Sequence, residues 1–450
     1  MVKNDFSKGP MWKCITAQAA PLMLAQLVQL LYNIVDRIYL GHLGDQNSLA
    51  LTGVGLVFPI VTLITAFSSL FGMGGVPLFS IARGEGKEEK AGKIMGNSFA
   101  LLLLSAVVLT ACGYLFSKPI LFAFGAGEAS YVYAREYLRI YLAGTVFSMI
   151  SAGMNGYINA QGFPKIGMLS VVVGAAANIL LDPVFIIWLD MGVSGAALAT
   201  VISQLLSAAW VVRFLFGRKP DISLTAKTNR IDGSITKEIC KLGTSNFVMA
   251  GTNCLVQVAC NSTLQAYGGD IFIGVMTVTN SVREIFHLPV SGLMGGAQPV
   301  ISFNYGARAY GRVKEAIRFN TVIGVVYTMI SWLFVVLFPE FWFRIFSDDL
   351  ALLQTGVPML RIYFFGFVFM SLQFAGQSVF QAVGDAKHAI FFSLLRKAFI
   401  VVPLTLVLPR LGLGVDGVFW AEPISNLIGG MACYTTMRLS VYRKLPRQQG

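Results

Sequence analysis

Long apolar runs separated by short polar connections make up most of the chain. Each run is longer than about 18 residues and carries few charges, which is typical of helices that cross a lipid bilayer. The strands of membrane β-barrels alternate over about ten residues, and these runs are too long and too uniform for that. The pattern predicts about twelve membrane-spanning helices, at 14–40, 49–72, 95–117, 129–158, 164–189, 193–217, 239–267, 271–297, 315–339, 352–381, 387–409 and 414–437.

The composition agrees with an integral membrane protein, since 55% of the residues are hydrophobic and the mean hydropathy is +0.68. A net charge of +12 would also fit a nucleic-acid-binding protein, but the cations gather at the two termini and on alternate connections. This is the positive-inside pattern, which predicts a multi-pass protein of the cell's inner or plasma membrane with both termini in the cytoplasm. We count Arg396 and Lys397 among these cytoplasmic cations. No partner is expected among nucleic acids.

The sequence shows no residue pattern that is typical of an enzyme or of a zinc site. The six cysteines lie in or beside apolar runs without paired spacing, and the three histidines are scattered. No zinc spacing and no dinucleotide fingerprint is present. The stretch from Arg83 to Lys87 is superficially similar to a phosphate-binding loop, but Ile81 stands where a glycine is required. We therefore expect neither an enzyme nor a resident cofactor. The polar start, Met1–Lys13, and the long run after it also argue against a cleavable signal peptide.

The second half of the chain repeats residues of the first half at a constant spacing. Gly74 and Gly296 are one such pair, and every other matched pair is separated by the same number of residues. An even number of helices in each half gives the halves the same orientation, and transporters built from such parallel repeats hold a cavity between them. We predict an N-terminal lobe at 1–217, a cytoplasmic linker at 218–237 and a C-terminal lobe at 238–450. Gly84 and Gly306, on equivalent connections, are expected to act as hinges whose backbone angles a side chain resists. The matching positions are Gly74, Pro77, Ser80, Gly84, Ala160, Gly162, Lys165, Gly192, Val193 and Gly195 in the first half, and Gly296, Pro299, Ser302, Gly306, Ala382, Gly384, Lys387, Gly414, Val415 and Gly417 in the second.

Two polar residues, Asn178 and Asp182, lie in the apolar run that starts at Pro164. Four residues apart, they share one face of a helix. An ionisable carboxyl is costly in lipid, so it is expected to face the protein interior or a water-filled cavity. The alternative is an aspartate at the end of the helix, before a turn at Pro183, that sits at the membrane interface.

Several motifs in order resemble the multidrug and toxic compound extrusion (MATE) family of cation-coupled exporters, over essentially the whole chain. The resemblance implies an all-α membrane protein with two pseudo-symmetric six-helix lobes around a V-shaped central cleft. It also implies antiport of Na⁺ or H⁺ against small amphipathic, often cationic, drugs. The motifs are 31–36 (Leu-Tyr-Asn-Ile-Val-Asp), 41–44 (Gly-His-Leu-Gly), 159–162 (Asn-Ala-Gln-Gly), 178–183 (Asn-Ile-Leu-Leu-Asp-Pro), 298–307 (Gln-Pro-Val-Ile-Ser-Phe-Asn-Tyr-Gly-Ala) and 381–384 (Gln-Ala-Val-Gly).

The resemblance further implies a polar coupling site in the N-terminal lobe. In this sequence its members fall on Asp36, Tyr137, Asn178, Asp182 and Thr200, with Tyr141 as the alternative tyrosine. Asp36, Asn178 and Asp182 are the expected Na⁺ ligands if the coupling ion is a metal rather than a proton. A helical rise of 1.5 Å per residue places Asp182 about 27 Å from Pro164, in the outer half of the membrane. One branch of the family also has a carboxylate on the seventh helix, which is lacking here.

Charged residues in the second half leave two interpretations open. Arg283 and Glu284 either pair with each other inside the membrane or line the cleft, and Gln257 on the seventh helix is a further candidate lining residue. Arg361 and Arg396 are expected to pair or to extend towards the interface. The glycines at 292 and 296 form a small-xxx-small pair, which is typical of helix packing.

The function that we predict is secondary active multidrug export by a monomeric protein. A lipid-linked oligosaccharide flippase of the same superfamily is the alternative, and its cleft would need several cations for a pyrophosphate. Here only Arg283, Arg361 and Arg396 are available in the second half. A membrane enzyme is the third hypothesis, supported only by the buried aspartates. The identity of the drug and the choice between Na⁺ and H⁺ stay open at this point.

Overall fold

The computed structural model describes residues 3–40, 47–124, 127–225, 231–346 and 350–446, and within these ranges the chain is helical, without strands. Each predicted apolar run falls on one helix or on helices in series, and several of these helices extend well beyond the predicted ends. Seven helices of the described ranges are long and apolar enough to cross a membrane, and an eighth span results if α13 (Leu350–Phe364) and α14 (Phe367–Ala382) count as one, although a 43° bend separates them. Twelve spans therefore stay a prediction.

Contacts divide the chain into two compact units. The first unit comprises Met1–Asp5 and Leu24–Gly243, and the second comprises Phe6–Met23 and Thr244–Gly450. This differs from the predicted boundaries, because helix α1 (Met11–Leu40) contributes its first half to the second unit. Part of the predicted linker also belongs to the first unit, where Ile222 and Leu224 are buried in the hydrophobic core.

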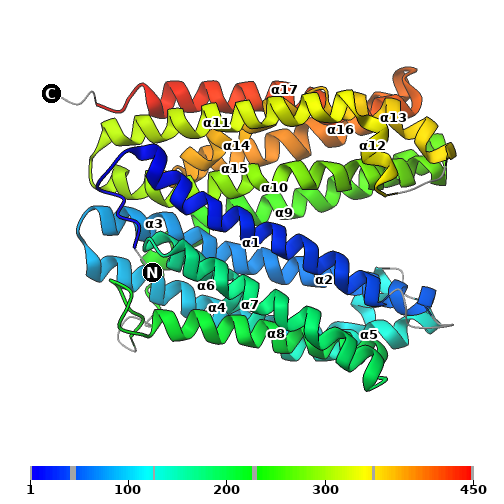
Figure 1. The fold of residues 1–450 in the computed structure, drawn as a ribbon, viewed down its shortest axis with the longest axis horizontal. Helices are drawn as coiled ribbons and strands as arrows, with labels where there is room; N and C mark the ends of the chain where they lie inside the picture. The colour runs from blue at the N-terminus through cyan, green and yellow to red at the C-terminus, as the bar shows by residue number, and fades with distance from the viewer. Residues whose placement is uncertain (1–2, 41–46, 125–126, 226–230, 347–349, 447–450) are drawn as a thin grey trace. The chain divides into compact units, whose positions relative to one another are not determined.

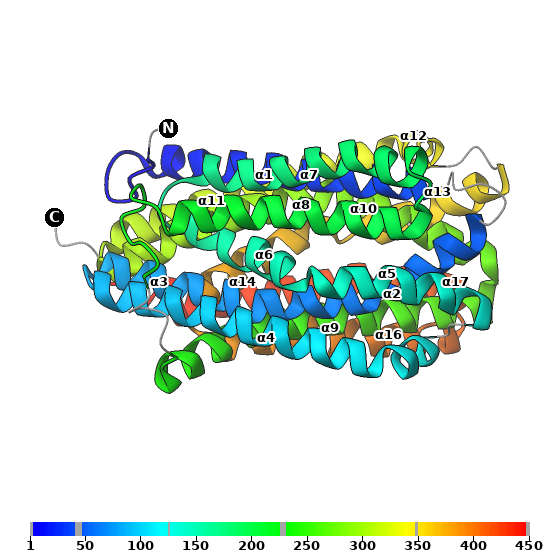
Figure 2. The ribbon, with the colours of Figure 1, turned by 90° about the horizontal axis from the view of Figure 1, so that it is seen from below.

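The first unit is a bundle of long helices that run side by side (Figures 1 and 2). Helix α8 packs against α5, α6 and α7, while α2 packs against α5 and α6. Two short π-helical segments, η2 and η3, interrupt the regular α-helices. The elements are α2 (Asn47–Ser68), η2 (Ser69–Met73), α3 (Gly74–Gly84), α4 (Glu88–Ala123), α5 (Glu128–Ala143), α6 (Thr145–Ala160), α7 (Pro164–Pro183), η3 (Val184–Trp188) and α8 (Gly192–Leu215).

In the second unit helix α14 is central, since it packs against α10, α11 and α17. Aromatic side chains such as Phe364, Phe367 and Phe380 fill much of the interior. Besides α13 and α14, the elements are α9 (Gly233–Gly268, shared with the first unit), α10 (Asp270–Gly306), α11 (Tyr310–Leu337), α12 (Pro339–Arg344), α15 (Ala386–Leu394), η4 (Leu395–Val401), α16 (Val402–Val407), η5 (Pro409–Leu411), α17 (Gly414–Met437) and η6 (Arg438–Tyr442).

The repeat predicted from the sequence recurs in the helix boundaries and in the backbone angles. Helices α4, α6 and α8 precede α11, α14 and α17 by the same offset that separates Gly74 from Gly296. Left-handed residues recur at this offset as well: Gly86 and Arg308 have φ values of 73° and 57°, and Gly162 and Gly384 have 89° and 79°. The halves are therefore equivalent residue by residue over most of their length.

The hinge prediction for Gly84 and Gly306 is wrong in its detail. Both are the last residues of α-helices, α3 and α10, and neither has a positive φ. The left-handed turn lies two residues further along, at Gly86 in one half and at Arg308 in the other. Each helix thus ends at its glycine without a left-handed conformation there, because a glycine tolerates the helical conformation as well.

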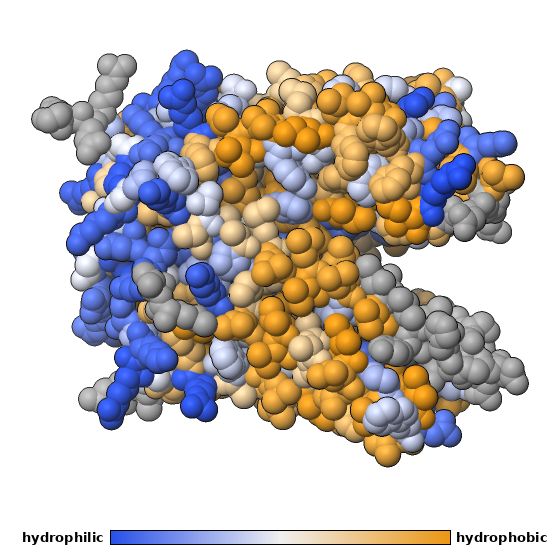
Figure 3. Space-filling view, in the orientation of Figure 1, coloured by the Kyte–Doolittle hydropathy of each residue, from blue (hydrophilic) through white to orange (hydrophobic). Residues whose placement is uncertain are grey.

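Large apolar side chains are exposed along the spans. Examples are Val107, Leu115, Ile330 and Leu337, each at least 59% exposed. In Figure 3 hydrophobic residues cover most of the visible sides of the helices, and hydrophilic residues gather at one end of each unit. Exposed apolar surface of this extent is typical of contact with lipid chains.

Candidate functional site

Helices α7 and α8 pack closely because small residues line their contact. A Cβ on Gly174 would lie 2.5 Å from Oγ of Ser207, so a larger residue there would force the Ser207 hydroxyl to move. The Ser207 hydroxyl donates to the backbone carbonyl of Ser170 on α7. This contact fixes the face of α7 that carries Asn178 and Asp182 inside the first unit.

Asn178 and Asp182 form the pair that their spacing predicts. Asn178 Nδ2 donates to Asp182 Oδ1 over 3.4 Å, and the two residues are only 1% and 0% exposed. The amide oxygen of Asn178 has no hydrogen-bond partner among the described residues. A buried carboxylate beside an amide oxygen that still lacks a donor is a hard, oxygen-rich environment, which suits a small cation or a proton.

Pro183 does not end the helix. The chain continues from α7 into the π-helical segment η3 and remains helical to Trp188. The proline lacks an N–H and crowds the preceding turn, which accounts for a wider turn at this point. The alternative of an aspartate at the end of a helix is therefore wrong, since Asp182 lies within a continuous helix and is fully buried, while its depth in the membrane stays a prediction.

Of the three other predicted members of this site, the structure describes the side chains of Tyr137 and Thr200. Tyr137 and Thr200 are each 7% exposed, and they lie on α5 and α8, which pack against each other. The rings of Tyr137 and Tyr141 stack with centroids 6.1 Å apart, and the Thr200 hydroxyl donates to the carbonyl of Ala196. Helix α1 contains the fifth member, Asp36, but its side chain lies outside the described residues. Sodium coordination by Asp36, Asn178 and Asp182 stays a prediction.

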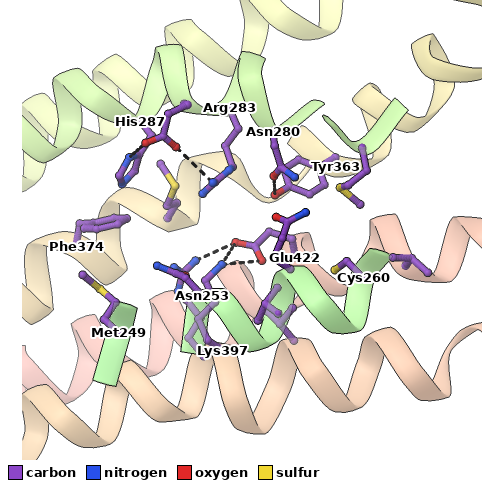
Figure 4. Close-up of a pocket in the computed structure, with 18 of the residues that line it drawn as sticks. Met249, Asn253, Cys260, Asn280, Arg283, His287, Tyr363, Phe374, Lys397 and Glu422 are labelled. Atoms are coloured by element: carbon purple, nitrogen blue, oxygen red, sulfur yellow. Dashed lines mark hydrogen bonds and ion pairs between the residues drawn. The ribbon is translucent and has the colours of Figure 1, made fainter. Parts of the chain in front are cut away.

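A second polar site lies inside the second unit, where side chains enclose a cavity of about 290 Å³ (Figure 4). The predicted lining residues Gln257, Arg283 and Glu284 all line it. Arg283 and Glu284 also form an ion pair, with Nη2 3.3 Å from Oε2. Arg283 and Glu284 thus both pair with each other and line a cavity, but this cavity lies within the second unit. That they line a cleft between the lobes stays a prediction.

Three charged residues at this cavity were missed or misplaced by the sequence reasoning. Lys397 Nζ donates to both carboxylate oxygens of Glu422, at 2.9 and 3.1 Å, and Arg396 Nη1 donates to Oε1 of the same carboxylate at 3.1 Å. All three side chains are at most 8% exposed. Arg396 and Lys397 were assigned to a cytoplasmic connection, which is wrong, since they lie in the middle of the span Ala386–Leu411. The separate expectation that Arg396 pairs is confirmed by its contact with Glu422. Charges inside two apolar runs were the signal that could have found them.

The π-helical segment η4 carries Arg396 and Lys397 and buries both. On a regular α-helix, the side chains of adjacent residues point about 100° apart. In this segment the head groups of both adjacent residues, Arg396 and Lys397, nevertheless reach the same carboxylate, that of Glu422. By the offset of the repeat, the counterpart of Glu422 in the first half is Thr200, and that of Tyr363 is Tyr141. The second unit therefore places the charged Glu422 where the first unit has the neutral hydroxyl of Thr200, while the tyrosine is kept in both halves. No group of three or more His, Cys, Asp or Glu suitable for a metal occurs in the described ranges.

Comparisons with known proteins give one consistent picture. The family profile described as MatE matches residues 21–184 and 247–407. The multidrug export protein MepA of Staphylococcus aureus (strain N315) is 24% identical over 438 residues, which cover 97% of this chain and 95% of that protein. The MepA protein of Staphylococcus haemolyticus (strain JCSC1435) is 23% identical, with coverages of 94% and 92%.

Solved structures share the fold. One is described as the outward-facing conformation of a multidrug resistance MATE family transporter of the MOP superfamily; it superposes with a TM-score of 0.93 at 24% identity, covering 100% of this chain and 99% of that one. A crystal structure of MATE in the straight conformation gives a TM-score of 0.92 at 24% identity, with 99% of both chains covered.

Proposed function

The chain belongs to the MatE family, and from this membership we propose that it is a secondary active multidrug exporter. It exchanges inward Na⁺ or H⁺ for small amphipathic or cationic molecules. The observation that carries the proposal is the buried Asn178–Asp182 pair, which lies inside an apolar span, where the resemblance implies a coupling site. The multidrug export proteins that cover nearly the whole chain support the substrate class, and they do not favour the flippase alternative.

The proposed mechanism follows from the burial of this site. A cation or proton that binds between Asn178 and Asp182 offsets the cost of the buried carboxylate. A ligand shifts a conformational equilibrium only by its differential affinity for the two states. Ion and drug must therefore favour different states of the transporter, so that ion entry drives drug release to the outside.

Transport in proteoliposomes tests this function. Purified protein is reconstituted with a fluorescent cationic dye, and a Na⁺ gradient and a pH gradient are imposed in separate experiments. We expect dye movement to follow one of the gradients and to stop when that gradient is collapsed by an ionophore. Dye movement that is the same with and without either gradient, and the same as in empty liposomes, would contradict the proposal.

The proposed orientation places both termini and the segment around Thr225 in the cytoplasm, following the distribution of Lys and Arg. Thr225 is exposed at the edge of the described residues. In a cysteine-free background, a single cysteine at this position should react with an impermeant maleimide only after the cells are opened. Labelling in intact cells would reverse the orientation.

A further inference from the structure

We propose that the cavity of the second unit is a binding site for the anionic group of a small aromatic carboxylate, with Arg283 as its main charged contact. The proposal concerns a site separate from the Asn178–Asp182 pair. It goes beyond the proposed function by adding an anionic amphiphile to the molecules that the protein binds, and it rests on that function for the step from binding to export.

The charges around the cavity carry the first step. Arg283, Arg396 and Lys397 face two carboxylates, Glu284 and Glu422, so the lining has one positive charge in excess when the histidine is neutral. A buried charge without a counterion is costly inside a membrane protein. One further negative charge would balance the site, and a cation would increase the imbalance.

The hydrogen bonds show which cationic side chain can still bind a ligand carboxylate. Arg396 and Lys397 already donate to Glu422, and Arg396 also donates to the amide oxygen of Asn426, so both cations of this trio are engaged in hydrogen bonds although they outnumber their carboxylate. Arg283 is held only by its sequence neighbour Glu284 at 3.3 Å, and its Nε is buried without a hydrogen-bond partner in the described part of the chain. Figure 4 shows Arg283 extending from α10 into the cavity. The guanidinium thus keeps donor capacity for a ligand carboxylate, the geometry to which it is best suited.

Aromatic and apolar groups determine the rest of the ligand. The ring centroids of Phe374 and His287 lie 5.0 Å apart. The guanidinium of Arg396 lies 6.0 Å from the centroid of the Phe374 ring. Met276, Met370 and other apolar side chains complete the lining. Sites with an apolar wall and a few fixed charges bind amphiphilic ligands. An aromatic ring against Phe374 and a carboxylate at Arg283 would match both features.

The volume limits the size of the ligand. A cavity of about 290 Å³ is at the lower end of the range for small-molecule sites. One or two fused rings with a single carboxylate fit this volume. The amides of Asn253 and Gln257 on α9 add neutral polar contacts to the lining.

Three probes that share one ring system test the charge preference. They are 2-naphthoate, the neutral 2-naphthamide and the cationic 2-naphthylmethylammonium, each titrated by calorimetry into the purified full-length protein in detergent. We expect the naphthoate to bind about tenfold more tightly than either of the others, as expected from one charge-assisted hydrogen-bonded contact. Tighter binding of the cation, or equal binding of all three, would overturn the proposal.

Two substitutions that should change the naphthoate affinity in opposite directions locate the site. Arg283→Gln should weaken naphthoate binding about tenfold, and Glu284→Gln should strengthen it several-fold, because it frees Arg283 from a competing carboxylate. Arg361→Gln is the matched control, since this arginine is exposed on α13 and does not line the cavity. It should leave the affinity unchanged.

The opposite signs keep the test decisive even if one variant fails to fold. A thermal unfolding midpoint accompanies each titration, and unchanged naphthoate affinity in folded Arg283→Gln or in folded Glu284→Gln would overturn the proposal. The measurement is independent of transport. Cationic dye transport without naphthoate binding would refute only this inference, whereas charge-selective naphthoate binding without gradient-driven transport would refute only the proposed function.

Discussion

Lys397 and Glu422 are joined by two hydrogen bonds inside the second unit, with Nζ 2.9 Å from Oε1 and 3.1 Å from Oε2. Both side chains are 6% exposed, and they come from two different spans, η4 and α17. An ion pair of this kind contributes to stability only while it is complete, because each partner was removed from water.

Removing one partner should therefore destabilise the protein. Lys397→Met leaves Glu422 with Arg396 as its remaining cation, and we expect a loss of about 3 kcal/mol of unfolding free energy. The double variant Lys397→Met/Glu422→Gln should not recover this loss, because it also leaves the buried guanidinium of Arg396 without its carboxylate partner. The midpoint of thermal unfolding, followed by tryptophan fluorescence, is the readout.

An exposed lysine is the matched control for this experiment. Lys87 pairs with Glu85 over 2.8 Å, but its side chain is 62% exposed. Lys87→Met should change the stability by less than about 1 kcal/mol, as is usual for surface ion pairs. Equal effects at Lys87 and Lys397 would contradict a stabilising role of the buried pair.

Asp182→Asn should abolish coupling rather than folding. The substitution keeps the shape of a fully buried side chain and removes its charge, so the site can no longer bind an ion in exchange for drug. We expect gradient-driven dye efflux per folded molecule to fall about tenfold or more. Asp190→Asn is the control, since Asp190 is exposed and its φ of 49° is well tolerated by asparagine. Normal efflux per folded Asp182→Asn molecule would overturn the coupling role.

Substitutions at the two equivalent left-handed turns should change the stability in opposite directions. Arg308 has a φ of 57°, a conformation that costs a side chain about 1 kcal/mol. Arg308→Gly should therefore raise the stability by up to about 1 kcal/mol, less the entropy that glycine adds to the unfolded chain. Gly86→Ala, at the counterpart with a φ of 73°, should lower it by a similar amount, although open space surrounds its Cβ position. Thermal midpoints that move in the same direction for both variants would contradict this account.

Adjacent glycines on α10 give the sharpest test of helix packing. A Cβ on Gly296 would lie 2.7 Å from the backbone N and Cα atoms of Ala19, whereas a Cβ on Gly295 would meet nothing within 4 Å. Gly296→Ala should cost about 1–3 kcal/mol through overpacking, and Gly295→Ala should gain about 0.5–1 kcal/mol through helix propensity. The same thermal assay distinguishes them, and two variants with equal stability would refute the close approach of the helices.

The helices and the repeat could be predicted because both depend on patterns that are local in the sequence. An apolar run of more than about 18 residues favours a helix in lipid whatever its neighbours are. The constant offset of the repeat, found from Gly162 and Gly384 among others, recurs in the left-handed φ angles of the same two residues. The hinge positions were missed by two residues, because glycine permits several conformations and does not by itself select one.

The sites were less predictable, because they depend on contacts between helices. The Asn178–Asp182 contact follows from a spacing of four on one helix and was predicted. The Lys397–Glu422 pair joins residues 25 positions apart on different spans, and the π-helical segment changes which face its residues occupy. A count of charges on connections therefore placed Lys397 outside the span in which it is buried.

The division of helix α1 between the units has a consequence for biosynthesis. Its first half is made first, yet its partners in the second unit are made much later: the carbonyl oxygens of Phe6 and Gly9 accept hydrogen bonds from Arg312, about 300 residues further along. At translation rates of about 5–20 residues per second, this segment waits roughly 15–60 s for them. If the chain were cut within 226–230 and the two halves co-expressed, the segment Phe6–Met23 would belong to the N-terminal polypeptide while its packing partners would belong to the C-terminal one. The native second unit would then form only from both polypeptides.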